Sequence, residues 1–316
     1  MRAAVRGEKN PIALKFEEYL RERRYCSHLS PETIRGYSAV FSLFLKVMPE
    51  ISVFEDLTPE MLVQFFERIE TRERIVGRNT IKTGVKNSTV KTQWSKLHVF
   101  FVWLEAKRLI KSNPLKSIKP PTPCYEDPRA LEDKDIHRMY SAITLHSRNS
   151  LLLRRDLMMV SLLLYTGLRK NEFISLHVRD VDLDKREIVV RAESSKSRNR
   201  RVLKIHPTLA LHLKDYFKER NSRSLKTEKL IIANRGDCGL TSEGLKHWVN
   251  TLIQKSGVRF HLHRFRHTFA CKLAEADVHP FKIQKMMGHT SLVMTMKYVR
   301  SMRTENMEED IQRITI

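Results

Sequence analysis

The chain has 316 residues, 41% hydrophobic and 30% charged, which is enough for two domains with cores of their own and excludes a disordered polymer. It carries 58 lysine and arginine residues against 36 acidic residues, a net charge of +22. A surplus of this size indicates a polyanionic partner. Because residues 1–120 hold +9 of it, we expect both halves to contact nucleic acid.

No apolar run reaches the roughly 20 residues that span a membrane, and no secretory signal opens the chain. The four cysteines are scattered, without a C-x-x-C pair, which is typical of reduced structural thiols. We therefore expect a cytoplasmic protein without membrane contact.

Residues 1–118 are predicted to form a helical domain. Ser30-Pro31 and Thr58-Pro59 each place a capping hydroxyl before a proline, the signal for a helix start. A third helix is predicted from about residue 88. Its aromatic stripe, which includes Phe100 and Phe101, recurs at helical spacing and is therefore assigned to the core rather than to base stacking.

A basic stretch lies between residues 74 and 104, where there is no acidic residue. Its part from residue 72 to residue 87 is predicted to be a long loop over a DNA groove. The alternative is a merely solvated surface, and we favour phosphate contact because acids are absent. The predicted DNA-binding residues here are Arg74, Arg78, Lys82, Lys86, Lys91 and Lys96.

A proline-rich linker is predicted over residues 119–130, because proline interrupts helices. Residues 131–316 then form a second domain, mainly α with one small β-sheet, that ends in a tail. The predicted helices cover residues 131–143, 156–165, 209–220, 242–256, 263–276, 280–287 and 292–300, with a short helix ending at residue 176. Two strands, at 188–190 and 202–205, flank a polar turn.

Four short motifs in this second domain carry chemistry-bearing residues. They are Thr166–Glu172, Lys196 in the polar turn, His263–His267, and Gly288-His289 followed by Tyr298. His263 and His267 stand at i, i+4, as in a zinc pair, but Arg264 occupies the position that glutamate takes in H-E-x-x-H. The positive charge there opposes a cation, so no metal is expected.

Together these motifs resemble the tyrosine recombinase, or phage integrase, family, and most closely its two-domain Xer-like members. The signatures T-G-L-R-x-x-E, K-x-x-x-x-R, H-x-x-R-H and G-H…Y all occur in order. The resemblance covers nearly the whole chain. It implies a helical, SAM-like core-binding domain followed by a mixed α/β catalytic domain.

The resemblance also implies roles for individual residues. Tyr298 is the expected nucleophile, which forms a 3′-phosphotyrosyl bond. Arg169 and Arg266 hold the scissile phosphate, and His289 donates a hydrogen bond to it. Bidentate guanidinium groups suit this role, because they stabilise the negative charge of the transition state without a metal.

The remaining implied roles concern proton transfer and support. Lys196 is the acid for the leaving 5′-oxygen, although Lys204 is a rival, and His263 accepts the proton of the tyrosine. The supporting residues are Glu172 and His267, and further DNA contacts are expected from Arg198 and Arg200.

The expected activity is site-specific recombination of double-stranded DNA by a homo-tetramer on paired core sites, through a Holliday junction. No cofactor is expected, and the chain has no phosphate-binding G-x-x-x-x-G-K-[ST] loop for ATP. A second recombinase or an accessory protein is a further partner that the resemblance allows. Two alternatives are a type IB topoisomerase, which shares the tyrosine chemistry, and a DNA-binding regulator without catalysis.

Overall fold

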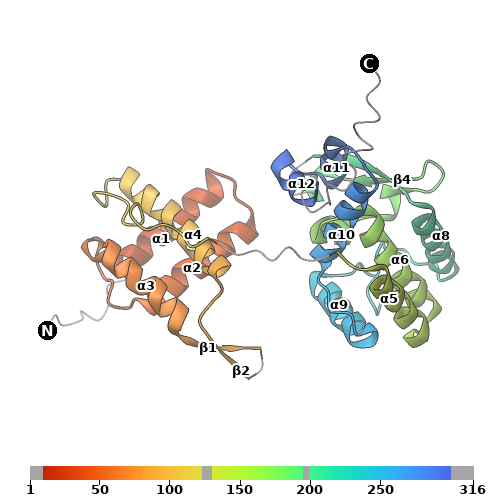
Figure 1. Cartoon of the computed structure of the whole chain (residues 1–316), viewed down its shortest axis with the longest axis horizontal. Helices are drawn as coiled ribbons and strands as arrows, with labels where there is room; N and C mark the ends of the chain where they lie inside the picture. Colours follow the sequence, from red (N-terminus) through yellow and green to blue (C-terminus); the bar gives the residue numbers. More distant parts are fainter. Residues whose placement is uncertain (1–9, 78, 123–129, 195–198, 300–316) are drawn as a thin grey trace, which may run out of the picture. The chain divides into compact units, whose positions relative to one another are not determined.

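The computed structural model describes residues 10–77, 79–122, 130–194 and 199–299 (Figure 1). The chain divides into two compact units, residues 1–126 and 127–316, which we call the N-terminal and C-terminal units. Each has its own hydrophobic cluster. Within the described ranges, no helix is both long enough and apolar enough to cross a membrane.

The N-terminal unit is a helical bundle whose helix starts follow the local sequence. The Ser30 hydroxyl accepts a hydrogen bond from the Thr33 amide, and the Thr58 hydroxyl accepts one from the Met61 amide. Both predicted helix starts are thereby confirmed. The helices are α1 (Pro11–Tyr25), α2 (Pro31–Val47), η1 (Phe54–Asp56), α3 (Pro59–Thr71) and α4 (Asn87–Ala106).

Aromatic side chains fill the core of this unit. The Phe16 and Phe41 rings stack at a centroid distance of 4.0 Å, and Phe100 lies 4.2 Å from Phe16. Phe100 and Phe101 are completely buried, which confirms that the aromatic stripe of α4 belongs to the core. These rings join α1, α2 and α4 into one packed cluster.

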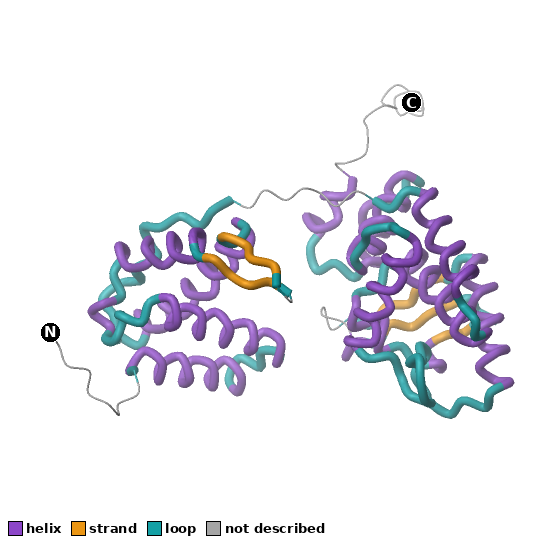
Figure 2. Tube along the Cα trace, turned by 90° about the horizontal axis from the view of Figure 1, so that it is seen from below, coloured by secondary structure: helices purple, strands orange, loops and turns teal. Residues whose placement is uncertain are grey.

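A β-hairpin replaces the loop that was predicted over residues 72–87. Strands β1 (Glu73–Val76) and β2 (Thr80–Thr83) pair antiparallel (Figure 2, orange). Five of their eight residues are isoleucine, valine or threonine, which favour strands, and Gly77 takes the left-handed conformation in the turn. The loop prediction was wrong because each strand is only four residues long and interrupted by basic side chains.

The C-terminal unit combines helices with a three-stranded antiparallel sheet of order β3-β4-β5. The two predicted strands pair with Val189 opposite Val202, while β3 is too short to be read from the sequence. The elements are α5 (Asp133–His146), α6 (Ser150–Thr166), α7 (Lys170–Ser175), η2 (Val178–Asp180), β3 (Val181–Asp182), β4 (Glu187–Val190), η3 (Ala192–Ser194), β5 (Arg201–Lys204), α8 (Pro207–Ser222), α9 (Ser242–Ser256), α10 (Leu262–Glu275), α11 (Pro280–Met287) and α12 (Leu292–Val299).

Helix α6 is the most buried helix of this unit and carries its core. It begins six residues before the predicted start at 156, because the Asn149 side chain caps it by accepting from the Leu152 amide. It ends at Gly167, whose φ of +57° requires glycine and whose Cα faces the Phe269 ring. Because the helix ends here, the residues that follow, from Leu168 on, turn into the candidate site.

Candidate active site

Arg169 enters the site directly after the glycine that ends α6. The Glu172 carboxylate accepts from the Arg169 backbone amide at 2.9 Å and from its Nη1 at 3.1 Å. The same guanidinium donates through Nη2 to the Gly288 carbonyl at 2.8 Å. The first motif is thus folded onto itself and tied to the end of α11.

Arg266 is almost fully buried near the start of α10. Its Nη1 donates to the Gly167 carbonyl at 2.7 Å and its Nη2 to the Met287 carbonyl at 2.6 Å. Burial and the charge of Arg169 lower the pKa of Arg266 to about 9, so it stays protonated at neutral pH.

Arg201, at the start of β5, completes this arrangement, although the sequence identified it only as a motif position. Its Nη1 and Nη2 donate to the two carboxylate oxygens of Glu172 at 3.0 and 2.7 Å, and its Nε donates to the Met286 carbonyl at 3.0 Å. Burial raises the pKa of the Glu172 carboxyl, but the bonds from Arg201 outweigh it and lower the pKa to about 2.

Three guanidinium groups therefore bind three successive carbonyls, those of Met286, Met287 and Gly288, at the C-terminal end of α11. Cations are favourable at this end of a helix, where the carbonyls lack intrahelical partners. The arrangement fixes the residue that follows, His289, against the arginines.

His289 is buried and its Nδ1 lies 2.8 Å from the Thr295 hydroxyl. Burial lowers its pKa to about 4, and the charges of Arg266 and Arg169 act in the same direction. His263 stands at the first turn of α10, where partial burial and the charge of Arg266 also lower its pKa. Both imidazoles are therefore neutral at pH 7.

Tyr298, on α12, faces this cluster. Its ring centroid lies 5.2 Å from that of His267 and 6.1 Å from that of His289, with the His289 ring nearly parallel to it. Its half-buried ring also packs on a small apolar cluster that includes Phe269 and Met287. The structure thus gathers every residue of the predicted catalytic set except Lys196, which lies outside the described residues.

Lys204, the alternative to Lys196 as the acid, already has an ion-pair partner. Lys204 is exposed on β5 and forms an ion pair with Glu187 at 2.6 Å. Within the described ranges, no group of three or more His, Cys, Asp or Glu side chains is suited to hold a metal ion.

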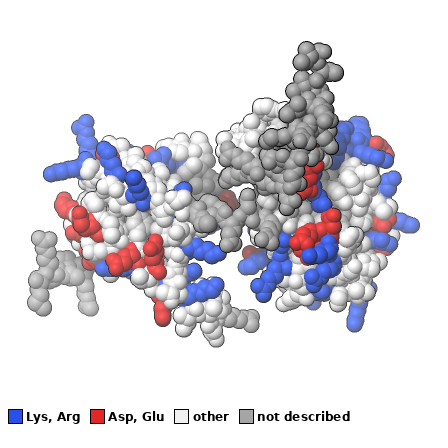
Figure 3. All heavy atoms as spheres, in the orientation of Figure 1, with Lys and Arg blue, Asp and Glu red and all other residues white. Residues whose placement is uncertain are grey.

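A basic cleft of about 1,000 Å³ opens beside the cluster in the C-terminal unit. Arg200, one of the predicted DNA-binding residues, lines it together with Arg201 and His289. Lys282 and Lys285, exposed on α11, line it too and were missed. Their i, i+3 spacing directly after Pro280 was the available signal. Lysine and arginine side chains are spread over the visible faces of both units (Figure 3).

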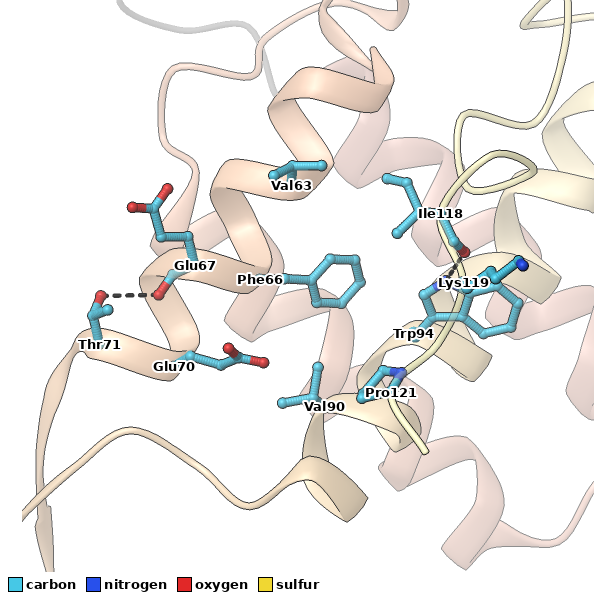
Figure 4. A pocket seen from close by; sticks show the side chains of 10 residues that line it. All are labelled: Val63, Phe66, Glu67, Glu70, Thr71, Val90, Trp94, Ile118, Lys119 and Pro121. Carbon is cyan, nitrogen blue, oxygen red and sulfur yellow. Dashed lines mark hydrogen bonds between the residues drawn. The ribbon is translucent and has the colours of Figure 1, made fainter. Parts of the chain in front are cut away.

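A second hollow, in the N-terminal unit, has a different character. It encloses about 410 Å³ between α3 and α4, with Val63, Phe66 and Trp94 in its walls and Glu67 and Glu70 at its edge (Figure 4). Apolar walls and two carboxylates, against the single basic residue Lys119, disfavour a phosphate group. This hollow is therefore not the site of DNA chemistry.

The predicted DNA-binding residues of the N-terminal unit fall into two groups. Arg74 and Lys96 also contact their own unit: Arg74 Nε donates to the Gly84 carbonyl at 2.7 Å, and Lys96 Nζ lies 5.6 Å from the Tyr37 ring centroid. The exposed group is Lys82, Lys86 and Lys91. Arg78, like Arg198 in the other unit, lies outside the described residues.

Comparison with known proteins places the site in a family. Residues 129–305 match the phage integrase family. A tyrosine recombinase of Agathobacter rectalis is 30% identical, over 75% of this chain and 82% of that protein. Tyrosine recombinase XerC of Serratia marcescens is 25% identical over 91% of both chains.

Solved structures share the fold. The Tn1549 transposon integrase in complex with a circular intermediate DNA superposes with a TM-score of 0.78 at 16% identity, over 97% of this chain and all of that one. A lambda integrase dimer bound to a core site gives a TM-score of 0.68 at 17% identity, over 91% of this chain and 94% of that one. The chain therefore belongs to the phage integrase family, as a Xer-like tyrosine recombinase. The resemblance, the fold class and the enzyme class drawn from its motifs are confirmed.

Proposed function

We propose that this recombinase cleaves and rejoins double-stranded DNA at specific core sites through a 3′-phosphotyrosyl bond to Tyr298. One observation carries the proposal: the half-buried Tyr298 ring lies nearly parallel to the buried ring of His289, which lines a basic cleft and follows the three carbonyls that bind Arg169, Arg201 and Arg266. The alternatives are relaxation of DNA in the manner of a type IB topoisomerase and DNA binding without catalysis.

The arginines retain donors for a phosphate. A guanidinium has five N–H groups, and the helix carbonyls and Glu172 take only part of those on Arg169 and Arg266. If the Thr295 hydroxyl donates to Nδ1 of His289, the proton of the neutral ring sits on Nε2, which then donates to a phosphate oxygen. Negative charge that develops on the phosphorus centre is stabilised by these fixed donors.

Bonds and protons balance in the proposed step. The Tyr298 oxygen attacks phosphorus, the tyrosyl proton passes to neutral His263, and the bond to the 5′-oxygen breaks as Lys196 protonates that oxygen. Glu172 and His267 support the cluster. Rejoining is the reverse reaction, and because the phosphodiester energy is kept in the tyrosyl ester, it requires neither ATP nor a metal.

We further propose that the protein acts as a tetramer on two paired core sites, through a Holliday junction. The lambda integrase dimer on a core site supports paired protomers, since it shares this fold. A second recombinase or an accessory protein remains a candidate partner. Each protomer would hold one half-site with its two basic units.

The test is a nicked duplex that traps a covalent intermediate, built on a core site that the full-length protein selects from randomised duplexes. Wild type and Tyr298→Phe are compared on a denaturing gel in excess chelator. A covalent band with wild type alone supports the proposal. Its absence on DNA that both proteins bind supports a regulator, and relaxation of plasmids that lack the site supports a topoisomerase.

A further inference from the structure

We propose that the β1–β2 hairpin is a DNA-reading arm whose Ile75–Ile81 pair contacts thymine methyl groups in the major groove. The inference rests on the proposed function in one respect only, that the protein binds double-stranded DNA. It assigns sequence preference to a segment that none of the four motifs contains.

The pair stands out because it is apolar, directly opposed and uncovered. Ile75 and Ile81 face each other across the ladder, and they are 75% and 65% exposed. Exposing two such side chains together costs about 1.5–3 kcal/mol each relative to burial. A two-stranded ribbon is also only marginally stable alone in water. Both facts favour a partner that covers this face.

The hairpin has the dimensions of a groove-reading ribbon. Its four-residue strands are about 13 Å long, and the major groove is about 12 Å wide and 8.5 Å deep, which admits a two-stranded ribbon. The Val76–Thr80 pair is nearest the turn and the isoleucines come next, within reach of base edges. The acid Glu73 shares the face of the isoleucines, but it is in the pair farthest from the turn and so lies toward the mouth of the groove.

The opposite face of the ribbon carries basic side chains, which are long enough to extend past its edges toward the phosphates on either side of a groove. Arg74 and Lys82 oppose each other there, because side chains alternate along a strand. No acidic residue follows until after residue 104. The isoleucine face can therefore meet the bases, where a thymine methyl group is the natural contact for an apolar side chain, while the long basic side chains reach around the ribbon to the flanking phosphates.

A second copy of this chain is a less favourable occupant. The hollow between α3 and α4 could receive an isoleucine, and its edge carries Glu67 and Glu70. However, specific interfaces cover about 800 Å² on each partner, far more than two isoleucine side chains provide. DNA satisfies the basic face and the apolar face together.

The experiment removes single methyl groups from the DNA. Deoxyuridine replaces each thymine in turn in the duplex that the full-length protein selects, and affinity is measured for wild type and for Ile75→Ala/Ile81→Ala. We expect the affinity of wild type to fall about fourfold when a contacted thymine is replaced, because burying one methyl group contributes about that factor to binding. The double variant should bind the all-thymine duplex more weakly and be indifferent to uracil at those positions.

The matched control is Leu14→Ala/Val102→Ala, which trims two exposed apolar residues of the same unit that lie outside both the hairpin and the hollow. It should keep the uracil sensitivity of wild type. Uracil sensitivity that persists in the isoleucine variant would overturn the proposal. A second result would also overturn it: the isoleucine variant binds a single half-site as tightly as wild type, but its copies associate with one another more weakly. That result would indicate that the hairpin docks on a neighbouring protein copy.

Failure of this proposal is distinguishable from failure of the proposed function. At saturating protein, the isoleucine variant should still form the Tyr298 adduct, because the hairpin contributes no residue to the site. Conversely, wild type that forms no adduct still reports on methyl contacts through its affinity alone.

Discussion

Replacing Arg201 by methionine should test whether this arginine positions the active site. The substitution leaves the buried Glu172 carboxylate with the two bonds from Arg169, at 2.9 and 3.1 Å, and removes its two bonds to Arg201, at 3.0 and 2.7 Å. Breaking one side of a buried ion pair costs about 3–5 kcal/mol. Because Arg169 stays, we expect the lower end, about 3 kcal/mol, which lowers the melting temperature of the C-terminal unit by about 6–12 °C.

The pH dependence separates this mechanism from a general packing defect. The pKa of Glu172 is about 2 in the folded protein and near 4.5 when unfolded, so its stabilising effect is complete above pH 4.5 and is lost as the pH falls toward 2. Without Arg201, burial raises this pKa. The folded and unfolded pKa values then lie closer together, so Arg201→Met should lose less stability than wild type between pH 4.5 and pH 2.

The assay is urea unfolding across this pH range, together with single-turnover cleavage. Misplacing the Arg169 guanidinium should slow cleavage by up to about a hundredfold while DNA binding is kept. The control, Arg200→Met, removes the neighbouring exposed arginine and should change stability by less than about 0.5 kcal/mol. If Arg201→Met loses under about 1 kcal/mol and keeps the acid profile of wild type, the positioning role is refuted.

Four further outcomes are expected. Gly288→Ala should cost about 1–2 kcal/mol in thermal unfolding, because φ is +61° and the new methyl would lie 3.0 Å from Arg201 Nη1. The His289 ring should titrate near pH 4 by NMR in the free protein, so stability falls as the pH drops from 6.5 to 4, and a bound phosphate should raise that pKa. Phe100→Ala should destabilise the N-terminal unit alone by about 3–5 kcal/mol in calorimetry. Lys82→Ala should weaken binding to all sequences alike and reduce the slope of log affinity against log salt by about 1.

The sequence predicted correctly those features of the fold that depend on residues close together in the chain, such as helix caps and the buried face of a helix. The hydroxyls of Ser30 and Thr58 before proline located two helix starts, and helical spacing assigned Phe100 to the core. The hairpin was missed because its strands are short and polar, and cross-strand pairing is not a local property. Local capping also explains the early start of α6 at Asn149, a signal that was present and overlooked.

The candidate site shows the same division. The residue types of its motifs were visible in the sequence, and the structure places Arg169, Arg266 and Tyr298 in one cluster. The partnership of Arg201 with Glu172 was not visible, because 29 residues separate them and only the tertiary fold, which packs β5 against α11, brings Arg201 to Glu172 on α7. The carbonyls that these arginines bind belong to the backbone, which carries no sequence signal at all.

The hydrophobic clusters of the two units share no residue. Substitutions that rebuild the aromatic cluster around Phe16 therefore leave the hydrophobic core of the C-terminal unit, around Arg169 and Arg266, unaltered. A chimera that joins a foreign N-terminal unit to residues 127–316 should then keep the chemistry of the C-terminal unit and prefer a different DNA site. The division between Glu126 and Asp127 is therefore the position at which to join a different DNA-binding unit without changing the C-terminal unit.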